Sequence, residues 1–196
     1  MKIGVRAHDY GKHSIEGLAS LLREEGYDGA QLALPKVFEE IDSYEDIRLS
    51  HIERIRRAFE KNRVEIPVMG CYMGNPDRSV REYAVETLKN CLLYAKEMGA
   101  GVVGTETAYP RLSREERAAW CPYMMDSLMR VMEEAQRIDM KLAIEPVYWH
   151  PLADLETTLK TIRMVDDPEH LRLIFDASNL LEFPETTDQD AYWNQW

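Results

Sequence analysis

Short apolar runs alternate with longer amphipathic stretches along the whole chain, and this alternation restricts the possible folds. Runs rich in Val, Ile and Leu are typical of buried strands, whereas apolar residues that recur every three or four positions indicate helices. Repeated strand–helix units predict a parallel sheet, either closed as a barrel or open and doubly wound. The expected strands are 2–7, 30–34, 65–69, 101–105, 141–145 and 172–176.

Helix signals lie between the expected strands. Segments 50–53 and 113–116 both read Ser-x-x-Glu, the capping-box pattern with which many helices begin. Pro122 follows the second of these segments and predicts a kink or a break in that helix, because proline lacks the N–H group that a helix interior requires. The last clear helix is expected to bury an apolar stripe of Leu155, Leu159 and Ile162.

The barrel form fits the chain better than the dinucleotide-binding open sheet. The first strand is followed by neither GxGxxG nor a P-loop. Polar residues instead follow several strands, as they do at the mouth of a barrel. A closed barrel needs eight strands and usually about 250 residues, whereas this chain has 196 residues and six strand candidates. We therefore expect an α/β fold of the TIM (β/α)8 type, incomplete here, with about six parallel strands and helices outside them, in a single domain over residues 1–196.

Composition restricts the partners. The formal charge is −11, from 24 basic and 35 acidic residues, and an acidic surface loses the counterion release that drives nucleic-acid binding. A small neutral or cation-assisted substrate suits this charge better. No apolar stretch approaches the roughly 20 residues of a membrane span, and no signal-peptide pattern precedes the first strand. We therefore expect a cytoplasmic protein with no nucleic-acid or membrane partner.

A pair of carboxylates closes two of the expected strands. Glu145 ends the run 141–145 and Asp176 ends the run 171–176, so the two acids are 31 residues apart, about one strand–helix unit. Ligands of parallel sheets bind at the carboxyl ends of the strands, and two neighbouring acids there supply half of a metal site. The alternatives are a salt-bridged loop acid for Glu145 and a helix N-cap for Asp176.

Four further polar residues are candidates for the same site. Glu106 ends a strand and lies between two threonines. It is either an acid–base group or an ordinary polar residue at the rim of the barrel. His8 and His150 follow strands and are either substrate contacts or plain polar side chains. Asn179 is either a substrate contact or a turn former.

The segments 143–150 (Ala-Ile-Glu-Pro-Val-Tyr-Trp-His) and 174–179 (Ile-Phe-Asp-Ala-Ser-Asn) resemble the xylose isomerase-like TIM-barrel superfamily. Its members include sugar-phosphate isomerases, ketose 3-epimerases, hydroxypyruvate isomerases, inosose dehydratases and endonuclease IV. The resemblance covers the whole chain, as the first six of eight strand–helix units. It implies one divalent cation (Mn, Mg, Co or Zn) held by four ligands, of which Glu145 and Asp176 match the first two. The other two ligands have no counterpart here, so the resemblance leaves open whether this chain holds a metal.

Two further positions depart from the family pattern. The second acid that epimerases carry after the fifth strand is missing from segment 147–151. The Asp-x-x-His common after the sixth strand reads Asp-Ala-Ser-Asn here. Asn179 can still hydrogen-bond a substrate hydroxyl, but it cannot exchange a proton.

Together these observations predict a sugar or sugar-phosphate isomerase or epimerase in which a divalent metal stabilises an enediolate. The predicted catalytic residues are Glu145 and Glu106, and the predicted substrate contacts are His8, His150 and Asn179. The alternative is a catalytically silent, truncated barrel that associates with copies of itself through open sheet edges. An endonuclease IV-like nuclease is disfavoured by the negative charge and by the lack of a His-rich ligand set.

Overall fold

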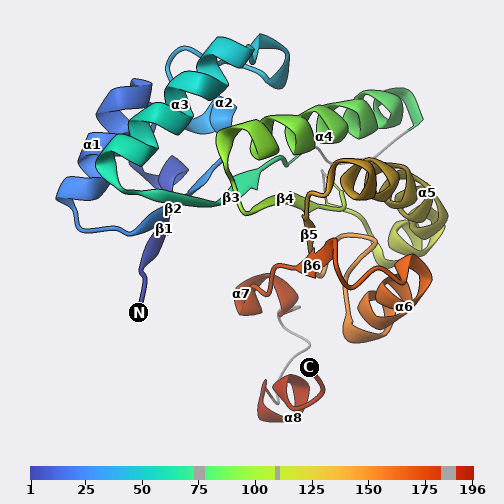
Figure 1. Cartoon of the computed structure of the whole chain (residues 1–196). Coiled ribbons are helices and arrows are strands. Elements are labelled where there is room, and N and C mark those ends of the chain that lie inside the picture. The colour runs from blue at the N-terminus through green and yellow to red at the C-terminus, as the bar shows by residue number, and fades with distance from the viewer. Residues whose placement is uncertain (73–77, 109–110, 182–188) are drawn as a thin grey trace. The chain divides into compact units, whose positions relative to one another are not determined.

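A computed structural model of the chain describes residues 1–72, 78–108, 111–181 and 189–196, and Figure 1 shows its helices and strands. The strands are β1 (Gly4–Arg6), β2 (Gly29–Leu32), β3 (Glu65–Gly70), β4 (Val102–Glu106), β5 (Leu142–Glu145) and β6 (Leu171–Leu173). The α-helices are α1 (Ile15–Glu24), α2 (Leu34–Val37), α3 (Leu49–Asn62), α4 (Arg78–Met98), α5 (Arg114–Ile138), α6 (Leu155–Val165), α7 (Ala177–Leu180) and α8 (Gln189–Trp193). Two short 3-10 helices are η1 (Ala7–Tyr10) and η2 (Tyr44–Asp46).

The described strands form a six-stranded sheet whose order follows the chain from β1 to β6. The pairs β1–β2, β2–β3, β3–β4 and β5–β6 are parallel, which confirms the predicted α/β class. The strand bounds differ from expectation at several ends, for example in β1 and β6. β1 begins at Gly4 instead of residue 2, and β6 ends at Leu173. The N–H of Ile174 still donates to the carbonyl of Ile144 (3.0 Å), but beyond it the chain turns into α7.

The chain divides into two compact units, and the expectation of a single domain stays a prediction. Unit 1 comprises Met1–Tyr72 and Thr87–Gly104. In it α1 packs against α3, and Figure 1 shows these two helices beside β1 and β2. Leu18 and Leu22 of α1 and Ile52 and Ile55 of α3 are fully buried, as the amphipathic spacing of both helices requires.

The predicted start of α3 is wrong by two residues. The N-cap is Arg48, whose backbone N–H donates to Nδ1 of His51 (3.4 Å). Ser50 therefore lies inside the first turn and does not cap the helix. Leu49, the first helical residue, is exposed, so the helix begins before the Ser-x-x-Glu segment from which its start was predicted.

Unit 2 comprises Met73–Glu86 and Thr105–Trp196, and α5 is its longest helix that lies wholly within the unit. The capping box at its start is confirmed, because the N–H of Ser113 donates to Oε2 of Glu116 (2.7 Å) and the Ser113 hydroxyl accepts from the Glu116 N–H (3.3 Å). Pro122 lies inside α5, which continues as one helix from Arg114 to Ile138. The predicted break is therefore absent. None of the described helices combines the length and apolar character that crossing a membrane requires.

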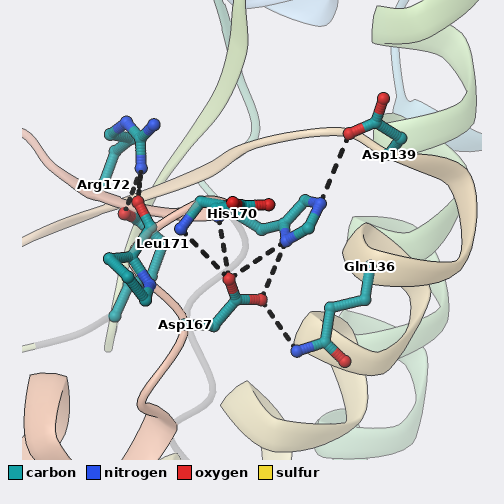
Figure 2. A network of polar contacts seen from close by, with 8 residues as sticks. Gln136, Asp139, Asp167, His170, Leu171 and Arg172 are labelled. Atoms are coloured by element: carbon teal, nitrogen blue, oxygen red, sulfur yellow. Dashed lines mark hydrogen bonds and ion pairs between the residues drawn. The ribbon is translucent and has the colours of Figure 1, made fainter.

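A partly buried polar network ties the C-terminal end of α5 to the turn between α6 and β6 (Figure 2). Asp167 Oδ2 accepts from Nε2 of Gln136 (2.7 Å) and lies 2.9 Å from Nδ1 of His170. The other ring nitrogen of His170 lies 3.4 Å from Oδ1 of Asp139. Because Asp167 and His170 are largely buried, these contacts satisfy polar groups that would otherwise be costly to desolvate.

The apolar stripe predicted for α6 points outward. Leu159 is 39% exposed and Ile162 is 37% exposed, whereas Thr158, Thr161 and Val165 are buried. The Thr158 hydroxyl can be buried because it donates to the carbonyl of Asp154 (2.7 Å). A surface hollow of about 490 Å³ lies next to this helix, and we call it the α6–β6 groove. Its apolar lining is Ile162, Leu171 and Leu173.

The exposure of Leu159 gives a test of this helix orientation. Leu159→Ala should change the free energy of unfolding by less than about 1 kcal/mol, because little apolar area leaves a buried site. The same substitution at the buried Leu142 of β5 should cost about 2–5 kcal/mol. Urea unfolding at one protein concentration measures both. Equal losses would show that Leu159 is covered in solution.

Candidate functional site

Glu145 and Asp176, the two predicted metal ligands, both contact one nitrogen atom. Nδ2 of Asn179 donates to Oε1 of Glu145 (2.7 Å) and lies 3.3 Å from Oδ2 of Asp176. The parallel register of β5 with β6 explains this convergence, since Ile144 pairs with Leu173 and both acids follow at the same edge of the sheet. Glu145 is only 6% exposed.

The other oxygen of Asp176 caps α7. Oδ1 accepts from the backbone N–H of Ser178 (2.9 Å) and from its hydroxyl (2.6 Å). The N-cap alternative is therefore correct for Oδ1, while Oδ2 still faces Glu145. The Asp176 carboxylate can both cap α7 and contact Asn179, because its two oxygens have different partners.

The carboxylate pair fits part of a site for a hard cation. Magnesium is commonly bound through one or two carboxylates, with water completing its coordination. Within the described ranges, no group of three or more His, Cys, Asp or Glu side chains is arranged to hold a metal ion. The assignment of Glu145 and Asp176 as metal ligands therefore stays a prediction.

Glu106 and His150 form a second pair in the same unit. Nε2 of His150 lies 3.8 Å from Oε2 of Glu106, which is too far for a hydrogen bond. The His150 side chain is 1% exposed, and its Nδ1 has no hydrogen-bond partner among the described residues. Burial lowers the pKa of His150 to about 4, so the ring is neutral near pH 7 and the contact with Glu106 is not an ion pair.

Backbone contacts hold the loop after β5 in place. The N–H of Leu152 donates to Oγ1 of Thr107, next to the end of β4 (3.3 Å), and the N–H of Tyr148 donates to the carbonyl of Asn179 (2.9 Å). The loop is also closed on itself, since the N–H of His150 donates to the carbonyl of Val147 (2.8 Å). Segment 147–152 therefore holds the backbone of both His150 and Asn179 in place.

His8 lies in unit 1, on η1 directly after β1. Its Nδ1 is buried without a hydrogen-bond partner in the described part of the chain. Burial lowers its pKa, and the nearby charge of Arg6 lowers it further. The roles assigned from sequence to His8, His150, Asn179, Glu106 and Glu145 stay predictions.

Sequence reasoning missed Arg111. Its guanidinium lies 4.2 Å from the ring centre of Trp149, a cation–π geometry. The N–H of the next residue, Leu112, donates to the carbonyl of Trp149 (3.1 Å). No local pattern pairs two residues so far apart in sequence, and only the folded loop shows that the Arg111 cation lies over the Trp149 ring.

Comparison with protein families identifies the fold. The family described as xylose isomerase-like TIM barrel matches residues 19–195. The chain belongs to this family. The resemblance stated from the two strand-end segments is thereby confirmed, as is the TIM-barrel-type class.

Solved structures show the same fold at low sequence identity. A xylose isomerase-like TIM barrel protein from Mycobacterium smegmatis, in complex with magnesium, is 15% identical, with TM-score 0.75 over 99% of this chain and 71% of the other. The 3-keto-D-glucoside 4-epimerase YcjR from E. coli is 18% identical, with TM-score 0.74 over 100% of this chain and 75% of the other. The IOLI protein with a bound zinc atom is 16% identical, with TM-score 0.68 over 92% of this chain and 64% of the other.

The chain thus spans about two thirds to three quarters of the length of these family structures. A comparison with curated protein sequences gives no significant match. The solved structures establish the fold, and the magnesium and zinc that two of them contain show that members of this fold bind divalent cations.

The buried His150 predicts a pH dependence of stability. Its folded pKa of about 4 lies below the unfolded value of about 6.5, so the unfolded state binds more protons between these values and stability falls as pH falls through this window. The contribution reaches about 3 kcal/mol near pH 4. Urea unfolding of wild type and His150→Gln at pH 4.5, 5.5 and 7 measures it. The variant should lose less stability on acidification, and parallel curves would contradict this account.

Proposed function

We propose that this protein is an isomerase or epimerase of a small sugar or sugar phosphate, assisted by a divalent cation. The observation that carries the proposal is the convergence of Glu145 and Asp176 on one nitrogen of Asn179. Membership of the xylose isomerase-like family supports it, as does the likeness to a 3-keto-D-glucoside 4-epimerase.

The proposed reaction begins with removal of a proton from the carbon next to a carbonyl, which gives an enediolate. Glu145 and Asp176 would hold the cation, because carboxylates are the oxygen ligands that Mg²⁺ and Mn²⁺ accept. When bound, such a cation stabilises negative charge on substrate oxygens as a Lewis acid. The charge of −11 favours a substrate recognised through a cation and disfavours nucleic acid.

Glu106 is the proposed proton carrier. It ends β4, as Glu145 ends β5, and its side chain is partly exposed. The neutral His150 ring adds no positive charge beside it, so this neighbour does not weaken the carboxylate as a base. The His150 side chain is 1% exposed in this structure, and its role as a substrate contact stays a prediction. Asn179 remains the proposed contact for substrate hydroxyls in this unit.

The test is exchange of a carbon-bound proton. The purified chain with Mn²⁺ or Mg²⁺ is incubated in D₂O with a panel of ketoses, aldoses and their phosphates, and NMR follows deuterium at the carbon next to the carbonyl. Glu106→Gln should slow exchange by about 10²–10⁴-fold, the usual contribution of a general base. Glu115→Gln, an exposed residue of α5, is the matched control. No exchange with any sugar would exclude the proposed function, and full activity in Glu106→Gln would exclude Glu106 as the proton carrier.

A second candidate is a catalytically silent barrel fragment that associates with a second copy of itself. The exposed apolar residues of α6 and β6 favour it, since Ile162 is 37% and Leu173 is 41% exposed and both line the α6–β6 groove. β6 is also an end strand of the sheet order, and an uncovered strand edge invites pairing.

Sedimentation over a range of protein concentrations distinguishes this candidate. Wild type should dimerise, and Leu173→Lys should shift the equilibrium towards monomer by about tenfold or more, because a charge would enter an apolar contact. Leu49→Lys changes another exposed leucine, in unit 1, and should leave the equilibrium unchanged. A wild type that is monomeric at every concentration would eliminate this candidate.

A further inference from the structure

The side-chain amide of Asn179 contacts both acids of the proposed cation site. Its Nδ2 is within 2.7 Å of one Glu145 oxygen and 3.3 Å of one Asp176 oxygen. The orientation of the amide follows from its partners, because only the NH₂ group can donate to two carboxylates. A cation bridging the pair must also contact one oxygen from each acid, at about 2.0–2.6 Å.

We propose that the Asn179 amide is a placeholder for the cation, which bridges the carboxylate pair in the metal-free protein and is displaced when a cation binds. The two carboxylates are like charges held at one edge of the sheet, and without a donor between them they would repel each other. The amide supplies two N–H groups at the shared point. This inference rests on the cation site of the proposed function and adds a positioning role for Asn179 within it.

The displacement needs only the side chain to move. The backbone of Asn179 is fixed, because its N–H donates to the carbonyl of Asp176 (3.2 Å) and its carbonyl accepts from the N–H of Tyr148 (2.9 Å). Rotation about the side-chain torsions removes the NH₂ group from the two carboxylates.

Ser178 provides a matched control on the same turn of α7. Its hydroxyl donates to Oδ1 of Asp176 (2.6 Å), so Ser178→Ala also removes one side-chain partner of Asp176. That oxygen is not the one that faces Glu145, and the contact with Glu145 Oε1 belongs to Asn179. If Mn²⁺ affinity changes in Asn179→Ala and not in Ser178→Ala, the change therefore comes from loss of the Asn179 bridge and not from a less stable α7 turn.

The experiment measures binding of Mn²⁺ alone, with free Mn²⁺ followed by electron paramagnetic resonance. Asn179→Ala should bind Mn²⁺ about three- to tenfold more tightly than wild type, because the cation no longer has to break hydrogen bonds to charged groups. The melting temperature of metal-free Asn179→Ala should fall, and Mn²⁺ should raise it by more than it raises that of wild type. Ser178→Ala should bind Mn²⁺ as wild type does. Unchanged or weaker binding by Asn179→Ala, or no binding by any form, would overturn the inference.

A measurement on the wild type covers the case in which Asn179→Ala fails to fold. In ¹⁵N-labelled protein with assigned side-chain amides, the Asn179 NH₂ resonances should shift on addition of Mg²⁺, in proportion to occupancy. Resonances that stay in place while Mg²⁺ binds would overturn the placeholder role. Sugar turnover is scored separately, so a chain that binds metal as described but exchanges no sugar proton refutes the proposed function and leaves this inference standing.

Discussion

The parallel pairing of β5 with β6 brings the candidate site together. The register Ile144↔Leu173 places the residues that follow both strands at one edge, so that Glu145 and Asp176 reach the same Asn179 nitrogen. A shift of this register by one residue would turn one acid to the other face of the sheet. The remaining features of the site, the capped turn of α7 and the loop after β5, are attached to this pair of strands through Asp176 and Asn179.

Burial gives the site its electrostatic character. Glu145 is almost fully covered and has a hydrogen-bond donor in Asn179, as a buried charge requires. His150 is covered even more completely, but its Nδ1 has no partner among the described residues. Burial accordingly lowers its pKa, and the ring stays neutral beside Glu106. At similar depth, Glu145 thus has a hydrogen-bond donor in Asn179, whereas Nδ1 of His150 has no partner among the described residues.

The α6–β6 groove shows where local pattern and tertiary structure disagree. Leu159 and Ile162 have the spacing of a buried stripe, but the helix presents Thr158 and Thr161 to the interior. Threonine can fill a core position when its hydroxyl finds a backbone acceptor, as Thr158 does. Exposed apolar side chains next to an end strand are typical of a surface that binds a partner.

The sequence by itself determined the class of fold, the number and order of the strands and the two acids at the strand ends, because periodicity and strand-end polarity are local properties. It also determined the capping box of α5, which depends on residues three positions apart. Only the tertiary structure decided that Asn179 joins Glu145 to Asp176, that His150 is buried beside Glu106, and which side of α6 faces the core. Each of these depends on contacts between segments distant in sequence, and local propensity carries no information about how such segments pack.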